Sequence, residues 1–202
     1  MRIHDYKQAP NPRRVRIFLA EKGLDIDYVQ VDLMTKQNMT PDFLGKNSMA
    51  ALPVLELDDG TCIAESVAIC RYFEELHPEP ALFGSTAKEK AEVEMWQRRM
   101  EFDLLFPVSQ AFRHGFPGFA DRVEQLPAWQ EQNQRRSVSQ FQWLNDLLAD
   151  REFVAGRTYT IADITALCAV DFAKIIKLRP GDEHPHLKRW HAAVSARPSA
   201  AA

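Results

Sequence analysis

Signals for β-strands are confined to the first third of this 202-residue chain. Up to about residue 76 short strand patterns alternate with helix patterns, and beyond Thr86 no convincing strand pattern occurs. Pro78 and Pro80 separate the two regions, because closely spaced prolines end a helix and stiffen a connection. The sequence therefore predicts a mixed α/β domain over residues 1–78 and an all-helical domain over residues 86–202.

The first region is predicted to fold in the order β-α-β-α-β-β-α. Asn11 and Pro12 are expected to open the first helix, because asparagine is a strong N-cap and proline suits the first helical position. Gly23 is expected to end that helix. Asp59 and Gly60 form the tight turn of a predicted hairpin. The strands are expected over residues 2–6 and 26–33, the hairpin over 53–64, and the further helices over 41–46 and 66–76.

The second region is predicted to be a helical bundle. Its helices are expected over residues 87–113, 129–148, 161–178 and 186–196. The third of these has the clearest start signal, because Thr160 places a hydroxyl at the N-cap and Asp163 a carboxylate three residues later. Tyr159 and Ile164 flank this capping box at the spacing of a hydrophobic staple. We interpret the motif as structural.

Composition excludes several classes of protein. The net charge of -3 argues against a nucleic-acid or anionic-membrane binder, which needs a basic surface. No apolar run approaches the roughly 20 residues that span a bilayer, and the N-terminus has no apolar signal segment. Cys62, Cys70 and Cys168 are odd in number and lie in apolar surroundings, so buried reduced thiols in a cytoplasmic protein are expected. No metal site is expected.

Several motifs carry a family likeness in register. Residues 10–23 (PNPRRVRIFLAEKG), 52–55 (LPVL), 65–66 (ES), 155–156 (AG) and 160–164 (TIADI) together resemble the cytosolic glutathione transferases over nearly the whole chain. Residues 104–109 (LLFPVS), with Phe112, His114, Pro117 and Gly118, resemble an atypical branch that lacks the usual catalytic tyrosine, serine or cysteine.

This resemblance implies a thioredoxin-like first domain, a helical second domain and a two-fold homodimer. It implies an enzyme that joins glutathione, as co-substrate and without a further cofactor, to a small apolar electrophile. Detoxification, catabolism and stress response are all compatible with that activity, and the sequence does not separate them.

The chemistry requires a glutathione thiolate, since a free thiol with a pKa near 8.5 is mostly protonated at neutral pH. In the family, the N-terminus of the first helix points at the sulfur, and a helix N-terminus supplies positive potential and N–H donors. Pro12 donates nothing, so the amides of Arg13 and Arg14 are expected to be the free donors. Ala9 occupies the place where most relatives carry a hydroxyl or thiol, and the atypical branch uses a bound water instead. Asn11 is a rival thiol ligand, and Tyr6 a weaker one.

The second domain is expected to hold that water. Residues at three- and four-residue steps, Phe102, Phe106, Ser109, Phe112, Arg113 and Phe116, share one face of an ideal helix. Ser109 matches the water-holding serine of the atypical branch and His114 a branch histidine. His114 is rotated away from Ser109 unless the helix loosens before Gly115. Alternatively, Ser109 bonds back to its own helix and His114 is a solvated helix end. The electrophile pocket is expected to be lined by Phe106, Phe112, Arg113 and Phe116, and Pro107 is expected to bend this helix.

The glutathione site is carried over from the family. The Leu52–Pro53 bond is expected to be cis, which exposes the Leu52 backbone to the cysteinyl part of the tripeptide next to Ala9. Ser66, at a helix start, suits the γ-glutamyl carboxylate, and Glu65 the α-amino group. Asn38, helped by Lys36, is expected to meet the glycine carboxylate. Simple helix capping is the alternative role for Glu65 and Ser66.

The sequence leaves one other function open and disfavours a second. The loss of a catalytic side chain at Ala9 is compatible with a non-catalytic glutathione-transferase-like binding protein, although the glutathione-binding residues are intact. A thiol oxidoreductase is disfavoured because no cysteine lies near the start of the first helix. Peroxide reduction by bound glutathione remains open as a side activity.

Overall fold

The computed structural model describes all of residues 1–202, which divide into two compact units. Unit 1 comprises Met1–Leu82 together with Pro198–Ala202, and unit 2 comprises Phe83–Arg197. The last five residues thus return to the first unit, whereas the sequence suggested that the second domain runs to residue 202. No helix is long and apolar enough to cross a membrane.

Unit 1 contains a mixed four-stranded sheet in the order β2-β1-β3-β4. β1 (Arg2–Asp5) pairs in parallel with β2 (Asp27–Gln30) and antiparallel with β3 (Val54–Glu56), which forms a hairpin with β4 (Cys62–Ala64). Gly60 has a φ of 85° in the hairpin turn, a conformation that glycine adopts at no steric cost. The predicted order of strands and helices along the chain and the hairpin are confirmed.

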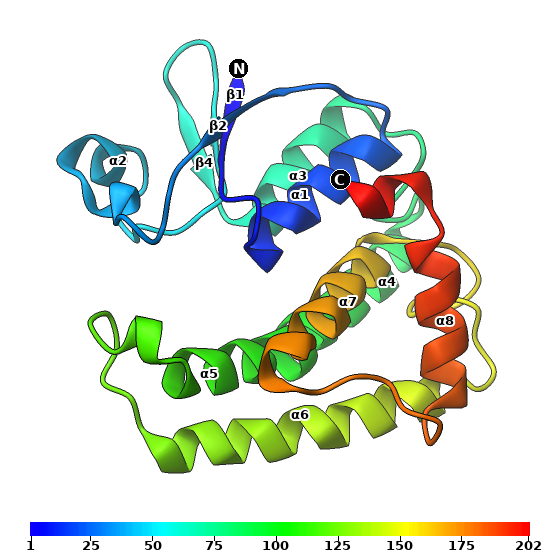
Figure 1. Ribbon diagram of the computed structural model, residues 1–202. Coiled ribbons are helices and arrows are strands. Elements are labelled where there is room, and N and C mark those ends of the chain that lie inside the picture. Colours follow the sequence, from blue (N-terminus) through cyan, green and yellow to red (C-terminus); the bar gives the residue numbers. More distant parts are fainter. The chain divides into compact units, whose positions relative to one another are not determined.

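The helices of unit 1 are α1 (Pro10–Glu21), α2 (Pro41–Lys46) and α3 (Ser66–Leu76), with the short 3-10 turn η1 (Gln37–Met39) before α2. α1 and α3 lie side by side against the sheet (Figure 1). The C-terminal turn η5 (Pro198–Ala201) packs on α1, where the Arg13 guanidinium donates to the Ala200 carbonyl at 3.0 Å. The bounds of α2 and α3 agree with the sequence prediction.

A cluster of charges joins the start of β1 to the end of β3, the two inner strands of this sheet. Glu56 on β3 lies 2.8 Å from an Arg2 nitrogen and 2.7 Å from His4 Nε2, both on β1, and 3.2 Å from Lys46. Hydrogen bonds from Arg2 and His4, helped by Lys46, hold the pKa of the Glu56 carboxyl at about 2. These contacts join β1, β3 and α2.

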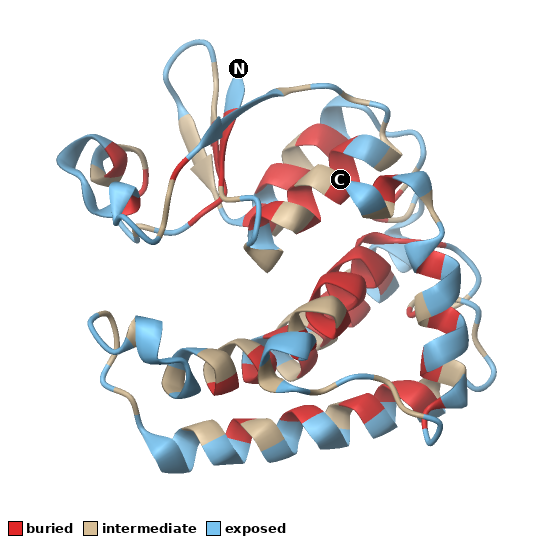
Figure 2. Cartoon of the chain, in the orientation of Figure 1, coloured by how far each residue is buried: buried red, intermediate tan, exposed pale blue.

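Unit 2 is helical. Its elements are α4 (Ala87–Arg99), the π-helical segment η2 (Met100–Leu105), α5 (Phe106–Gly115), the 3-10 turn η3 (Pro117–Phe119), α6 (Pro127–Leu147), α7 (Ile161–Phe172), the 3-10 turn η4 (Ala173–Ile176) and α8 (Pro185–Ser195). Ten consecutive residues of α7, from Ile161 to Val170, are buried (Figure 2). The predicted bundle is therefore organised around α7.

The π-helical segment corrects the prediction of one regular helix bent at Pro107. The Phe106 N–H donates to the Glu101 carbonyl, five residues earlier, immediately before the proline. This wider turn relieves the clash of a proline ring with the carbonyl four residues back. A π-helical turn also holds more residues than an α-helical one, so the predicted common face does not extend to Phe102. The Phe102 side chain is 53% exposed and lies under the Arg98 guanidinium.

The capping box at the start of α7 is confirmed and buried. The Asp163 carboxylate accepts from the backbone N–H groups of Val154 (2.9 Å) and Thr160 (3.0 Å), from the Thr160 hydroxyl (3.2 Å) and from the indole of Trp190 (2.9 Å). One carboxylate thus ties α7, α8 and the preceding loop together. Cys70 and Cys168 are buried free thiols, and Cys62 is half-buried.

Candidate functional site

Three chain segments converge at one edge of the unit 1 sheet because of its register. His4 near the end of β1 pairs with Val54 at the start of β3, and Val54 pairs with Ala64 at the end of β4. The loop into α1, the Leu52–Pro53 peptide and the start of α3 therefore leave the sheet at the same edge. All of the predicted glutathione contacts except Asn38 and Lys36 lie on these three segments.

The start of α1 differs from the prediction. The helix begins at Pro10, its N-cap is Ala9 with extended backbone, and no side chain caps it. Asn11 is thus inside the first turn and not at the N-cap, because its neighbouring prolines both fit the first helical turn. Its side-chain oxygen accepts from the Arg14 guanidinium at 3.0 Å.

The free N–H donors at this helix end also differ from the predicted amides of Arg13 and Arg14. The amide of Arg13 donates to the Ala9 carbonyl at 3.3 Å and so forms the first intrahelical bond. Pro10 and Pro12 have no N–H, which leaves the Asn11 amide as the N–H of the first turn that no intrahelical bond uses. No acidic residue lies in this turn, so the positive end of the helix dipole is not neutralised.

The Leu52–Pro53 peptide is cis, as predicted. The Leu52 side chain packs into a core cluster with Val31, Phe43 and Val54, and Tyr6 lies against the same cluster. The Leu52 backbone N–H and carbonyl take no part in the backbone hydrogen bonds of the chain. Main-chain groups left unpaired beside a sheet can pair with an added peptide strand.

The start of α3 is not a side-chain cap. Glu65 occupies the N-cap position with a φ of 70° and makes no capping hydrogen bond, so the simple capping role does not apply. A positive φ costs about 1 kcal/mol or more for a residue with a side chain. The Ser66 side chain is buried at 3% exposure at the first position of α3. Glu65 is exposed beside it.

Asn38 is less suited to a carboxylate than the sequence suggested. Its side chain is buried, and the amide nitrogen donates to the Ala50 carbonyl at 2.7 Å. The amide oxygen is buried without a hydrogen-bond partner. Because this oxygen only accepts, it would repel a carboxylate and would suit an N–H or a water. Lys36 is exposed two residues earlier.

In unit 2, Ser109 and His114 occupy different surroundings on α5. Ser137 and Ser139 on α6 bond back to carbonyls four residues earlier, but the hydroxyl of Ser109 makes no such bond. His114 accepts the Leu126 N–H on its Nδ1 at 3.1 Å. The helix remains regular to Gly115, so the loosening that would bring His114 round to Ser109 does not occur.

The aromatic residues of α5 form one compact group. Phe112 stacks on Phe116 with ring centroids 5.1 Å apart, and the rings of Phe119 and Phe172 meet it edge-on. Arg113 lies with its guanidinium 5.9 Å from the Phe119 ring centre. Phe106 is 43% exposed and belongs to no ring pair in this group.

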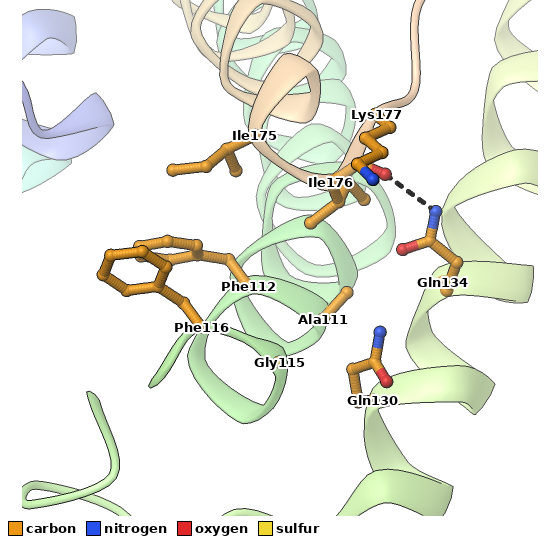
Figure 3. A pocket seen from close by; sticks show the side chains of 9 residues that line it. All are labelled: Ala111, Phe112, Gly115, Phe116, Gln130, Gln134, Ile175, Ile176 and Lys177. Carbon is orange, nitrogen blue, oxygen red and sulfur yellow. Dashed lines mark hydrogen bonds between the residues drawn. The ribbon is translucent and has the colours of Figure 1, made fainter. Parts of the chain in front are cut away.

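A cavity of about 470 Å³ lies against this aromatic group. It is lined by α5, α6 and the end of η4, and Figure 3 shows the nine lining residues. Phe112 and Phe116 of the predicted electrophile pocket line it, while Phe106 and Arg113 do not. The sequence reasoning missed the lining residues outside α5: Gln130, Gln134, Ile175, Ile176 and Lys177.

Comparison with known proteins assigns both units. Residues 9–76 match the Glutathione S-transferase, N-terminal domain, and residues 95–198 match the Glutathione S-transferase, C-terminal domain. The chain belongs to the glutathione S-transferase family.

Similar members of the family support this assignment along the full length of the chain. Glutathione S-transferase 2 of Saccharomyces cerevisiae is 38% identical over 98% of this chain and 87% of that protein. The crystal structure of Gtt2 from Saccharomyces cerevisiae matches with a TM-score of 0.93 at 38% identity, covering 98% of each chain. A glutathione S-transferase domain-containing protein from Marinobacter aquaeolei VT8 matches with a TM-score of 0.93 at 43% identity, covering 98% of this chain and 99% of that one.

The family assignment confirms the predicted fold, a thioredoxin-like N-terminal unit followed by a helical unit. It also makes this glutathione S-transferase an enzyme that acts on glutathione. The sequence signal that could have corrected the α1 start is the Pro10-Asn11-Pro12 repeat, since two prolines fit one first turn.

Proposed function

We propose that this glutathione transferase keeps the glutathione sulfur ionised with the N-terminus of α1, and that no side chain at its cap takes part. The observation that carries the proposal is the start of α1, where the N-cap residue Ala9 has no side chain able to cap the helix. The unused N–H of the first turn belongs to Asn11. A thiolate there gains one charge-assisted hydrogen bond and the field of a helix of 12 residues. Asn11 acts through its backbone, since its side chain already binds Arg14.

Ser109 holds the water that accepts the thiol proton in this proposal. This role is supported by the Ser109 hydroxyl, which forms no hydrogen bond within α5, whereas the Ser137 hydroxyl donates to a carbonyl of its own helix. His114 acts as a positioning residue, because its Nδ1 receives the Leu126 N–H and so ties the end of α5 to the start of α6. The electrophile lies against Phe112 and Phe116, which line the cavity of unit 2, whereas Phe106 and Arg113 do not line it.

Glutathione is proposed to lie along the sheet edge of unit 1. Its cysteinyl part pairs with the unpaired backbone of Leu52 beside Ala9 and Pro53. The Ser66 hydroxyl and the N-terminus of α3 receive the γ-glutamyl carboxylate, and Glu65 receives the α-amino group. Lys36 meets the glycine carboxylate, while the free oxygen of Asn38 accepts a peptide N–H or a water.

We also propose an oligomeric state, a location and a cellular role. The family likeness supports a cytoplasmic homodimer that conjugates small apolar electrophiles in detoxification, without a metal or further cofactor. It supports no nucleic-acid or membrane partner, in line with the net charge of -3. Elution size tests the dimer, and a monomer at micromolar concentration would contradict it.

The mechanism is tested by titrating the thiolate absorbance of bound glutathione in the wild type, Ser109→Ala and the control Ser139→Ala. We expect the bound thiol pKa to fall by at least about one unit in the wild type, worth about 1.4 kcal/mol. Ser109→Ala should lower kcat/KM about tenfold, less than the roughly 10²–10⁴-fold typical of a side chain that transfers the proton itself, because here the water accepts it. The Ser139→Ala control should match the wild type, because that serine is exposed on α6.

Each outcome of this experiment tests a different part of the proposed mechanism. Unchanged turnover and unchanged thiol pKa in Ser109→Ala would remove the water-holding role. Glutathione that binds without any fall in its thiol pKa, in the wild type itself, would favour a non-catalytic binding protein.

A further inference from the structure

The cavity of unit 2 has one apolar wall and one polar wall. Phe112, Phe116 and Ile175 form the apolar side, and Gln130, Gln134 and Lys177 lie on the opposite side in Figure 3. The volume of about 470 Å³ is within the range of sites for small organic molecules. A ligand that fills this cavity meets rings at one end and hydrogen-bonding groups at the other.

Lys177 is the only charged residue that lines the cavity, and no carboxylate lines it. Lys174, one turn earlier, is paired with Asp171 at 3.0 Å, whereas Lys177 has no ion pair. The cavity therefore carries a positive charge that the protein itself does not neutralise. Lys177 is an exposed residue, so pairing its ammonium with an anion gives the modest gain in affinity of an exposed ion pair.

The backbone at Lys177 holds this lysine in an uncommon conformation. Its φ is 61°, in the left-handed region, where it ends η4 and donates its N–H to the Lys174 carbonyl at 3.0 Å. Glycine is the usual residue at such a position, because a side chain there costs about 1–2 kcal/mol. The fold accepts this cost at Lys177, as it does at Lys36 with a φ of 60°.

Two glutamines complete the polar wall. Gln134 donates its amide to the Ile176 carbonyl at 3.0 Å, which fixes the residue before Lys177 to α6. Gln130 packs against Gly115, where a Cβ would come within 3.1 Å of the Gln130 Cγ and 3.3 Å of its amide nitrogen. The Gln130 side-chain amide makes no hydrogen bond within the chain. Gln130 thus offers N–H donors on the same polar wall as Lys177.

We propose that the electrophile of this enzyme is an acid: an aromatic or aliphatic body lies on Phe112 and Phe116, and its carboxylate or similar anion is bound by Lys177 with help from Gln130. The inference rests on the proposed transferase function and names the substrate class of the same site. In the reaction, the glutathione thiolate forms the carbon–sulfur bond to the electrophile. The leaving group departs with its bonding electrons, and the thiol proton passes to water.

The test compares a chlorodinitrobenzoate with the matching uncharged chlorodinitrobenzamide. The thiolate displaces chloride from either ring, so the pair differs only in the anionic group. KM is measured with glutathione, and binding is measured separately by calorimetry without glutathione. The variants are Lys177→Gln and the matched control Lys174→Gln, both of which remove one lysine charge from η4 or its end.

We expect the wild type to bind the benzoate about three- to fivefold more tightly than the benzamide, the size of a partly exposed ion pair. Lys177→Gln should abolish this preference in both Kd and KM, and Lys174→Gln should retain it. The preference should weaken as salt is added. A preference that survives Lys177→Gln, or no preference in the wild type, would overturn the inference.

Failure of the transferase function gives a different pattern. In that case no variant turns over either compound, yet the calorimetric preference for the benzoate still depends on Lys177. Turnover of both compounds without any preference would instead leave the transferase function intact and reject the acid as substrate class.

Discussion

Replacing Asp163 by alanine tests the claim that one buried carboxylate holds the core of unit 2. The side chain is fully buried and receives four hydrogen bonds, two on each oxygen. Alanine leaves three N–H groups without an acceptor, those of Val154, Thr160 and Trp190. The Thr160 hydroxyl can turn to another partner. At about 2 kcal/mol for each orphaned buried donor, this loss is about 6 kcal/mol.

The same substitution removes a cost that the wild type carries. Burial raises the pKa of Asp163 from 3.8 to about 6, although hydrogen bonds from Val154, Trp190 and Thr160 oppose the rise. Keeping the carboxylate ionised in the folded state near neutral pH therefore costs about 3 kcal/mol. The net loss of unfolding free energy in Asp163→Ala is then about 3 kcal/mol, a fall of about 6–12 °C in Tm for a chain of this size.

The assay is thermal and urea unfolding followed by circular dichroism, with Glu89→Ala as the matched control. Glu89 closes the capping box of α4 with bonds from the Ser85 and Thr86 amides, but this box is exposed. Water replaces the lost carboxylate there, so the control should lose much less stability. Equal losses in the two variants would show that burial of the box is unimportant.

The pH dependence of the free energy of unfolding gives a second check, because the raised pKa of Asp163 fixes the direction of the effect. Between pH 7.5 and 4.5 the folded wild type takes up a proton on Asp163 that the unfolded chain, with a pKa near 3.8 there, mostly does not bind. Acidification therefore stabilises the wild type through this group by about 2 kcal/mol, and alanine cannot titrate. The gap between wild type and variant should widen as pH falls; a gap that narrows would refute the reasoning.

Two further predictions concern unit 1 and the start of unit 2. Because hydrogen bonds from Arg2 and His4 hold the pKa of Glu56 at about 2, its stabilisation is present above pH 4.5 and is lost as pH falls toward 2. Glu56→Gln should lower the free energy of unfolding by about 1–2 kcal/mol at neutral pH after allowance for solvent screening. The urea midpoint of the variant should also fall less than that of the wild type as the pH drops below 4.5, and an equal fall would contradict this. Gly84→Ala should destabilise by at least about 3 kcal/mol in thermal melts, because φ is 83° and a Cβ would lie 2.7 Å from the backbone of α4. The control Gly60→Ala, with a φ of 85° and open space, should lose only about 1 kcal/mol, and similar losses in both would exclude the clash.

Features that depend on a few neighbouring residues could be predicted from the sequence. The capping box of Thr160 and Asp163, the hairpin turn at Gly60 and the cis bond before Pro53 were all predicted and are all present. Their physical cause is local, because the hydrogen bonds and steric limits involved lie within about four residues. The family likeness, carried by such motifs in register, followed from the same local signals.

The first turn of α1 shows where local rules gave the wrong answer. Asparagine is the better intrinsic cap, yet the helix begins at Pro10 with Ala9 as its cap. The sequence permits either start, since each proline suits a first turn. The position of β1 and the bond from the Ala9 amide to the Tyr6 carbonyl at 2.9 Å select the earlier start.

The amino-acid sequence by itself determined the order of the elements, the capping box of α7, the hairpin turn and the family. Tertiary packing decided the π-helical turn before Pro107, the burial of Asn38 and the meeting of Phe112, Gln130 and Lys177 around one cavity. The reason is that helix register and side-chain convergence depend on contacts between segments far apart in the chain. A pattern read along one helix contains no information on which residues of another helix complete its pocket.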